Sequence, residues 1–355
     1  MTEVYDIAII GAGPAGTVLA KELSLSIPEL KILLVDSTQK KVCGGLLAPD
    51  AQKALATLGL TLPNSVLADP QIFDVETIDL SSRYVRNYQR HYLNMDRAKF
   101  DAWLLSLSGE NVTVVRGLCA SIEKDDNIFK IQVRADGKET EYTASSVAGA
   151  DGAKSIVRST FFEKNVYHYV AIQERFKAEN SSASVPPYAC IFDKTTSDSC
   201  SWLISKDGET IFGGAFKIQD CRRSFEEQKL HLEKLMGVSL GKATDFEACL
   251  LTHPRKFSDF LVGKESVYLL GEAAGFISAS SFEGISYAIT SAVLLAEAFR
   301  SGATHTEIHK IYKRKTLKLR LKLYFKIIKG RILCSPLLRK MIMKSGIKSI
   351  KKDKK

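Results

Sequence analysis

Three glycines and an acid near the start of the chain have the types and spacing needed to hold a dinucleotide. The run Gly11-Ala12-Gly13-Pro14-Ala15-Gly16 follows an apolar segment that ends at Ile10, and Asp36 comes twenty residues after Gly16. After a strand and before a helix, the first glycine makes a tight turn, the second admits a pyrophosphate to bare backbone, and the third lets the helix pack on the strand. The free N–H groups at the start of that helix then face the anion.

Asp36 favours some dinucleotides over others. It follows the second predicted strand, residues 31–35, where its carboxylate would accept hydrogen bonds from the adenosine ribose and repel a 2′-phosphate. FAD or NAD therefore fits this position better than NADP. The alternative interpretation is a glycine-rich turn that holds no ligand.

Length and composition are those of a globular protein with a sizeable core. The chain has 355 residues, 45% of them hydrophobic, which suits two intertwined domains. Its seven cysteines are scattered without the spacing of zinc ligands, so we expect neither a disulfide framework nor a metal, and we expect a cytoplasmic protein. The N-terminus lacks the basic segment of a signal sequence, and no apolar stretch is long enough to span a bilayer.

Apolar periodicity and turn residues predict alternating helices and strands around the glycine run. The predicted helices are 14–24, 49–58, 96–107, 224–236 and 284–299. The predicted strands are 5–10, 31–35, 112–115, 119–123, 128–134, 141–148, 169–176, 188–192, 201–205, 210–216 and 267–270. The four strands between 112 and 148 suggest a β-meander. Residues 62–94 are predicted to be extended, because Pro63 and Pro70 argue against a helix.

Two later segments also place glycine turns after predicted buried strands. They are Ala148-Gly149-Ala150-Asp151-Gly152 and Leu270-Gly271-Glu272-Ala273. Taken alone, Asp151-Gly152 suits an ordinary turn. Taken together with the first run, the three segments resemble the FAD-binding set of flavoproteins with the p-hydroxybenzoate hydroxylase fold.

This resemblance implies a fold class of α/β plus α+β. A Rossmann-like FAD-binding domain would be assembled from residues 1–68, 95–165 and 262–302. An antiparallel-sheet substrate domain would be interleaved with it at 69–94 and 166–261, and residues 303–355 would form a basic helical tail.

The same resemblance implies which residues surround FAD. They are Gly11, Gly13, Pro14, Ala15, Gly16, Asp36, Cys43, Gly44, Gly45, Arg97, Asp151, Gly271, Glu272, Gly284 and Ile285. Glu272 would accept a hydrogen bond from a ribityl hydroxyl, although flavoproteins of this fold usually have aspartate there. Gly284 and Ile285 would begin a helix facing the N1 and O2 edge of the flavin, where a helix N-terminus favours the negative charge of reduced flavin.

Two further segments point to one family of this fold. Val42-Cys43-Gly44-Gly45 resembles the Cys-Gly-Gly segment of geranylgeranyl reductases, flavoenzymes that saturate isoprenoid double bonds. The segment from Ser201 to Gly208, followed by Phe212-Gly213-Gly214, is similar to the aromatic strand that lines their substrate cavity, which implicates Trp202 and Phe212. Similar stretches over almost the whole chain resemble one branch of this family, the CbrA-type flavoproteins.

The resemblance implies an FAD-dependent oxidoreductase that reduces a C=C bond of an isoprenoid or other apolar, lipid-like substrate. NAD(P)H or a ferredoxin-like protein would supply the electrons. The Cys43 thiol would donate or relay a proton, unless it merely fills a loop, and Trp202 would line the cavity or belong to the sheet core. A flavin monooxygenase and an FAD-binding, membrane-associated protein with little turnover remain as alternatives.

Positive charge is concentrated at the end of the chain. Residues 310–355 hold 18 Lys and Arg and a single acid, so the rest of the chain carries a net −7 within a total of +10. Residues 317–329 predict an amphipathic helix with lysines 318, 322, 326 and 329 on one arc and apolar side chains opposite. The apolar face would pack on the enzyme or bind an anionic membrane surface, and nucleic acid is not expected because no recognised module is present.

Overall fold

A six-stranded sheet forms the centre of one half of the molecule. The computed structural model describes residues 4–39, 41–163, 166–177 and 185–351. The strand order in this sheet is β17-β18-β11-β2-β3-β7. Its strands are β2 (Ile7–Ile10), β3 (Ile32–Asp36), β7 (Val112–Arg116), β11 (Val147–Gly149), β17 (Gly263–Lys264) and β18 (Val267–Leu269). All neighbours except β17 and β18 run parallel, and β2 is buried throughout, as expected of a parallel sheet covered on both faces.

Helices cover this sheet. They are α1 (Pro14–Ser26), α2 (Pro49–Thr57), α3 (Arg97–Leu105), α4 (Ile156–Phe161) and α6 (Ile285–Ser301). Proline at the first position of α1 suits a helix start, because proline has no N–H to leave unsatisfied. α1 packs on α6, whose buried face includes the small residues Ala288 and Ala292.

A four-stranded sheet lies beside the central sheet, in the order β1-β10-β9-β8. Its strands are β1 (Val4–Tyr5), β8 (Leu118–Asp125), β9 (Ile128–Ala135) and β10 (Lys138–Ala144). Only β8, β9 and β10 form an antiparallel meander, because β1 joins β10 in parallel. The meander predicted from four strands between 112 and 148 is wrong in its first strand, since residues 112–116 form β7 in the central sheet. The single strand predicted over 141–148 is also wrong: β10 ends at Ala144, and Val147 begins β11 in the other sheet. The chain changes sheet where the Ser145 N–H and the Ser146 hydroxyl donate to the carbonyl oxygens of Tyr5 and Asp6.

The other half of the molecule is built on a large, mainly antiparallel sheet, in the order β16-β12-β15-β14-β13-β5-β6-β19. The strands are β5 (Ile72–Asp79), β6 (Tyr84–Asn94), β12 (His168–Lys177), β13 (Tyr188–Phe192), β14 (Cys200–Lys206), β15 (Glu209–Phe216), β16 (Asp245–Thr252) and β19 (Ser349–Ile350). A short strand, β4 (Leu46–Leu47), also pairs with β6. Helix α5 (Cys221–Met236) packs on β15, where Phe225 contacts Phe212 and Phe216.

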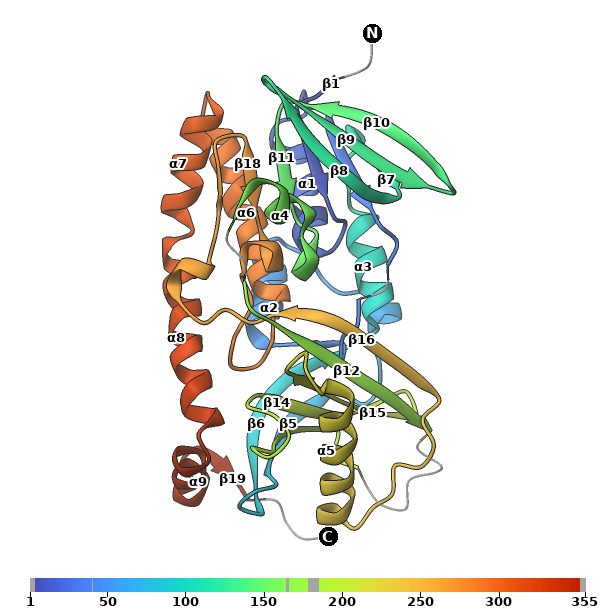
Figure 1. Ribbon diagram of the computed structural model, residues 1–355, viewed down its shortest axis with the longest axis vertical. Coiled ribbons are helices and arrows are strands. Elements are labelled where there is room, and N and C mark those ends of the chain that lie inside the picture. Colours follow the sequence, from blue (N-terminus) through green and yellow to red (C-terminus); the bar gives the residue numbers. More distant parts are fainter. Residues whose placement is uncertain (1–3, 40, 164–165, 178–184, 352–355) are drawn as a thin grey trace.

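The C-terminal segment runs along one side of both halves (Figure 1). It consists of α7 (His305–Lys315), α8 (Leu317–Cys334), α9 (Pro336–Ser345) and β19. The Tyr312 hydroxyl donates to the Leu269 carbonyl oxygen in the central sheet, and β19 pairs with β6 in the antiparallel sheet. The described part of the basic segment is therefore packed against the rest of the molecule at both of its ends.

A buried ion pair fixes the far end of this segment. Arg339 of α9 donates to Asp79 at the end of β5 over 3.0 Å, and the two side chains are only 3% and 0% exposed. Burial alone would raise the pKa of Asp79, but hydrogen bonds from Arg339 and Ser82 hold it below its ordinary value. Each charged group is therefore stabilised by its partner in place of water, because neither side chain reaches the solvent.

Arg339→Ala should destabilise the protein by about 3–5 kcal/mol, since it leaves Asp79 buried without its counter-charge. Urea unfolding monitored by tryptophan fluorescence measures the change. Arg134→Ala is the matched control: it breaks the exposed pair with Glu139 and should cost no more than about 1 kcal/mol. An equal loss of unfolding free energy in the two variants would contradict the stabilising role of the buried pair.

Candidate cofactor site and the adjoining cysteine loop

Three glycine turns meet at the ends of neighbouring parallel strands. Gly11, with φ of +103°, follows β2 and lies close to the turn after β11. A Cβ at Gly11 would lie 2.6 Å from the Ala150 carbonyl oxygen. A Cβ at Gly271, after β18, would lie 3.0 Å from that of Ala15 in α1. The three turns that the sequence predicted to act together therefore lie side by side.

Gly13 and Gly16 have different surroundings. A Cβ on Gly16 would clash with the Gly11 carbonyl oxygen, so glycine is needed there for α1 to pack against the turn. A Cβ on Gly13 would meet no described heavy atom within 4 Å. Gly13 also precedes Pro14 as the N-cap of α1, and no side chain caps that end. The backbone at Gly13 therefore faces open space beside free helical N–H groups, which suits an anion.

Two predicted acids lie at strand ends near these turns. Asp36 ends β3, and one of its oxygens accepts from the Thr38 N–H over 3.0 Å. Asp151 follows β11, and its Oδ2 accepts from the Ile156 N–H over 2.7 Å. Its Oδ1 is buried and has no hydrogen-bond partner among the described residues. Burial raises the pKa of Asp151 to about 6, against the opposing effect of its hydrogen bonds.

Glu272 is already engaged by protein groups. One carboxylate oxygen accepts from Lys41 Nζ over 2.7 Å and the other from the Thr252 N–H over 2.9 Å. Burial alone would lower the pKa of Lys41, but Glu272 beside it raises that pKa. A Cβ on Gly152 would lie 4.0 Å from Lys41 Nζ, so this lysine links the second and third turns.

Arg97 connects the site to the cysteine loop. It is the first residue of α3, and its Nε donates to both carboxylate oxygens of Asp101, over 2.8 and 2.9 Å. Burial alone would lower the pKa of Arg97, but Asp101 and a hydrogen bond with the Cys43 side chain raise it. The Cys43 sulfur also accepts from the Gly45 N–H over 3.3 Å. Cys43 thus lies beside a guanidinium that stays charged.

A second buried cation holds the same loop from the antiparallel sheet. Lys206, the last residue of β14, donates to the carbonyl oxygens of Gly44, Gly45 and Met95, over 2.9, 3.3 and 2.6 Å. Burial lowers the pKa of Lys206 to about 8. A Cβ on Gly45 would clash with both the lysine amine and the Met95 carbonyl oxygen, so the loop fits this lysine only with glycine there.

The two predicted cavity residues lie on opposite faces of the antiparallel sheet. A Cβ on Gly44 would lie 3.8 Å from the Trp202 ring, and the buried indole N–H has no hydrogen-bond partner among the described residues. Trp202 also packs with the cluster around Tyr169 and Ile277. Phe212 pairs with Leu203 on the other face and is buried against Phe225 of α5. The structure therefore brings Trp202, but not Phe212, to the cysteine loop.

The last two predicted residues start α6, as expected. Gly284 is the N-cap and Ile285 the first residue of this helix, and no side chain caps it. Beside them, the Tyr92 hydroxyl donates to Glu283 over 2.9 Å.

Lys41 and Lys206 were not predicted as site residues. Lys41 lies two residues before Cys43, and Lys206 precedes the turn residues Asp207-Gly208, so both have the local setting of exposed lysines. A basic residue flanking a glycine segment is the one local signal that points to Lys41. No local signal separates Lys206 from a lysine at the end of any hairpin.

Comparisons with known proteins agree with this geometry. Residues 6–172 match the family model described as "Lycopene cyclase protein". Among solved structures, a geranylgeranyl bacteriochlorophyll reductase-like protein from Thermoplasma acidophilum has a TM-score of 0.78 at 16% identity, covering 95% of this chain and 88% of that one. PqsL from Pseudomonas aeruginosa, a probable FAD-dependent monooxygenase, has a TM-score of 0.70 at 16% identity, covering 97% and 100%. These likenesses show the fold of flavin-dependent oxidoreductases.

Sequence relatives are much closer. Protein CbrA of Escherichia coli strain CFT073 is 44% identical over 359 residues, covering 98% of this chain and 95% of that protein. Protein CbrA of Shigella sonnei is also 44% identical, covering 98% of each. The chain therefore belongs to the CbrA family.

Proposed function

We propose that this protein is an FAD-dependent oxidoreductase that reduces a carbon–carbon double bond of an isoprenoid or another apolar, lipid-like substrate. The observation that carries the proposal is the meeting of three glycine turns beside a Cys-Gly-Gly loop that contacts Trp202. The fold shared with a geranylgeranyl reductase-like protein supports the reductase assignment.

The residues present fit FAD. Gly13 leaves room at a helix N-terminus for a pyrophosphate, Asp36 ends the strand next to it, and the unpartnered oxygen of Asp151 offers a polar contact. Glu272 would exchange one of its present partners for a ribityl hydroxyl, or act through Lys41. When bound, FAD supplies a hydride to one alkene carbon, after reduction by NAD(P)H or a ferredoxin-like protein.

The chain's own residues must supply the proton for the second carbon. Cys43 is the candidate, because it is the residue of the Cys-Gly-Gly loop whose side chain carries a proton that can be donated. Arg97 and Lys206 hold the loop from two sides, so they would keep the sulfur in one position. The alkene would then gain one hydride and one proton, and the thiol would be reprotonated from solvent.

Apolar surroundings support an apolar substrate. Trp202 packs with buried Tyr169, Ala215, Leu251 and Ile277 and with half-buried Phe282. A hydrocarbon chain would gain about 25 cal/mol for each Å² of apolar surface that leaves water for such a wall. The unpartnered indole N–H would donate to a single polar group at one end of the substrate.

Gly13→Ala should separate cofactor binding from folding. Its methyl group meets no protein atom and suits the extended backbone at this position, so the thermal midpoint of the FAD-free protein should change by less than about 2 °C. The same methyl group would obstruct the pyrophosphate and should weaken FAD binding at least roughly tenfold. Fluorescence titration with FAD measures the affinity, and unchanged affinity would contradict this cofactor position.

FAD affinity should depend on pH through Asp151. Below about pH 6 its carboxyl is protonated and can donate to a phosphate oxygen, whereas above that pH its negative charge repels the pyrophosphate. Raising the pH from 5 to 7.5 should therefore weaken FAD binding by about tenfold, equal to a rise of about one pKa unit on binding. Asp151→Asn should flatten the profile, and an equally steep profile in that variant would exclude this assignment.

Anaerobic single turnover tests the reaction. Protein with dithionite-reduced FAD should be reoxidised by a polyprenyl diphosphate or polyprenol, and mass spectrometry should show two added hydrogen atoms per double bond. Cys43→Ser should retain FAD and slow this step by roughly 10²–10⁴-fold, the range of general acid catalysis. Cys221→Ser, which changes a half-buried thiol of α5, is the control and should react normally.

Other outcomes favour the alternatives. Rapid NAD(P)H oxidation with an oxygen-dependent hydroxylated product would identify a monooxygenase. Stoichiometric FAD that no lipid extract reoxidises would indicate a flavin-binding protein with little turnover. A normal rate in Cys43→Ser would remove the proton-donor role while leaving the reductase assignment in place.

A further inference from the structure

Helix α8 has an inner face that packs on the enzyme. Its buried residues are Leu319, Arg320, Leu323, Ile327 and Gly330. A Cβ on Gly330 would lie 3.0 Å from the Ala279 carbonyl oxygen, so the helix approaches the enzyme closely at that point. Arg331 extends from the helix to donate to the Arg255 carbonyl oxygen over 2.9 Å. These contacts attach α8 to the rest of the molecule, and of its remaining apolar residues Tyr324 also meets the Phe257 ring at its edge.

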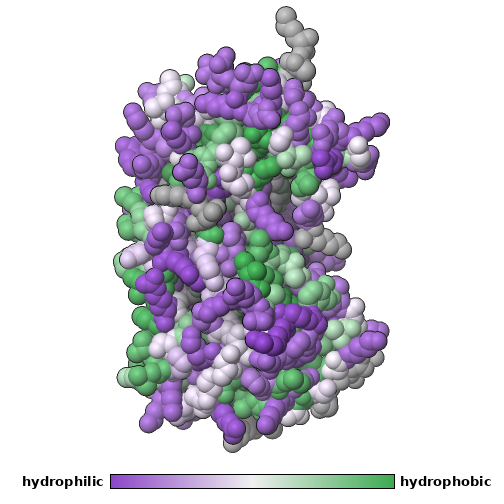
Figure 2. Space-filling model, in the orientation of Figure 1, coloured by the Kyte–Doolittle hydropathy of each residue, from purple (hydrophilic) through white to green (hydrophobic). Residues whose placement is uncertain are grey.

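A second apolar face of α8 points to solvent. We call it the apolar stripe, and it consists of Leu317, Leu321, Tyr324, Phe325, Ile328 and Ile332. Its spacing is that of one continuous side of a helix. Phe325 is 65% exposed, and every member is at least 37% exposed. Hydrophobic side chains gather along the edge of the molecule where α8 runs (Figures 1 and 2).

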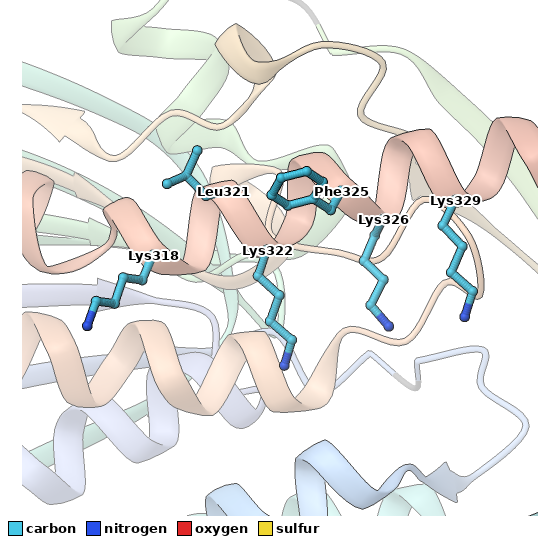
Figure 3. A pocket seen from close by; sticks show the side chains of 6 residues that line it. All are labelled: Lys318, Leu321, Lys322, Phe325, Lys326 and Lys329. Atoms are coloured by element: carbon cyan, nitrogen blue, oxygen red, sulfur yellow. The ribbon is translucent and has the colours of Figure 1, made fainter.

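A row of lysines borders the apolar stripe. Lys318, Lys322, Lys326 and Lys329 project toward the same side of α8, next to Leu321 and Phe325 (Figure 3). Together these side chains line a shallow, open hollow of about 650 Å³. Lys322 pairs with Asp50 over 2.8 Å, and within the described part of the chain no salt bridge joins another lysine of this row to a carboxylate.

Helix α9 and the turn after it also expose apolar side chains. Leu337, Met341 and Ile347 are 68%, 61% and 67% exposed. Lys340, Lys344 and Lys348 alternate with them and are also exposed. Exposed apolar side chains gathered in this way mark a surface that contacts a protein, a membrane or a ligand.

We propose that α8 and α9 form a docking surface for an anionic lipid membrane. The apolar stripe would enter the boundary between headgroups and acyl chains, while the lysine row reaches anionic headgroups. Within the described residues, no helix is both long and apolar enough to cross a membrane, so α8 would lie parallel to the membrane surface. This surface does not depend on the proposed cofactor or reaction.

Charge distinguishes a membrane from other occupants of this surface. Residues 310–355 carry +17, so a second copy of the chain would bring like charges together. A nucleic acid would match the lysines, but it would leave Leu321, Ile328 and Ile332 of the apolar stripe without a matching partner, since its phosphates bind basic side chains. An anionic bilayer interface matches both the lysines and the apolar stripe.

Flotation of the full-length protein with lipid vesicles tests the proposal. Vesicles of phosphatidylcholine with one-quarter phosphatidylglycerol should carry the protein upward at low salt, whereas pure phosphatidylcholine vesicles should carry much less. Lys318→Gln, Lys326→Gln and Lys329→Gln combined should lower the partition coefficient on the order of 100-fold. Leu321→Ser, Phe325→Ser and Ile328→Ser combined should lower it at least roughly tenfold and leave salt-sensitive residual binding.

Two control variants match these changes elsewhere on the surface. Lys138→Gln, Lys234→Gln and Lys242→Gln combined remove the same charge from exposed positions. Phe73→Ser with Leu118→Ser removes exposed apolar side chains that are 67% and 48% exposed. Both controls should float like the unchanged protein. All variants should keep the thermal midpoint within about 3 °C, because they alter side chains that are exposed or, at Lys326, half-buried.

Four results would overturn the proposal. The first is that the unchanged protein fails to float with the phosphatidylglycerol vesicles. The second is that the controls lose as much binding as the variants of α8. The third is that light scattering shows a dimer that the serine variant converts to a monomer, which would assign the apolar stripe to a second copy. The fourth is that a random RNA oligomer displaces the protein from the vesicles, which would assign the surface to nucleic acid.

Discussion

In the half of the molecule built on the six-stranded sheet, backbone segments approach each other more closely than side chains would allow. α1 can pack on its own turn only because Gly16 lacks a Cβ opposite the Gly11 carbonyl oxygen, and Gly11 in turn lies against the backbone of Ala150. These contacts set the distance between the start of α1 and the loop after β11. A single added methyl group at either glycine would separate elements that must present their N–H groups to one place.

The loop around Cys43 is held in a different way, by charge rather than by absent side chains. The Lys206 amine reaches from the antiparallel sheet to three carbonyl oxygens, one of them on Met95 just before α3. Hydrogen bonds of this kind offset the cost of removing an amine from water. Since Arg97 contacts the same loop from α3, the position of Cys43 is set jointly by both halves of the molecule.

Local signals predicted most elements and the three turns, because each turn joins an apolar strand to glycine within a few residues. They could not divide residues 141–148 between two sheets, since the break depends on hydrogen bonds to Tyr5 and Asp6. Nor could they orient Phe212: β15 is buried on both faces, so its pattern does not show which face meets Trp202. The Lys41–Glu272 pair joins residues 231 positions apart, so the basic residue beside the glycine segment could not be matched to its carboxylate from the sequence.

The final described strand has a consequence for association between molecules. β19 pairs with β6, which would otherwise be the outer strand of the antiparallel sheet. An uncovered outer strand offers unpaired N–H and C=O groups to any extended chain and promotes sheet-to-sheet aggregation. β19 pairs with β6 only at Asn87 and Tyr88, so it shields the backbone groups in the middle of that edge from another strand. The lysines on either side of it would repel a second sheet that approached the same edge.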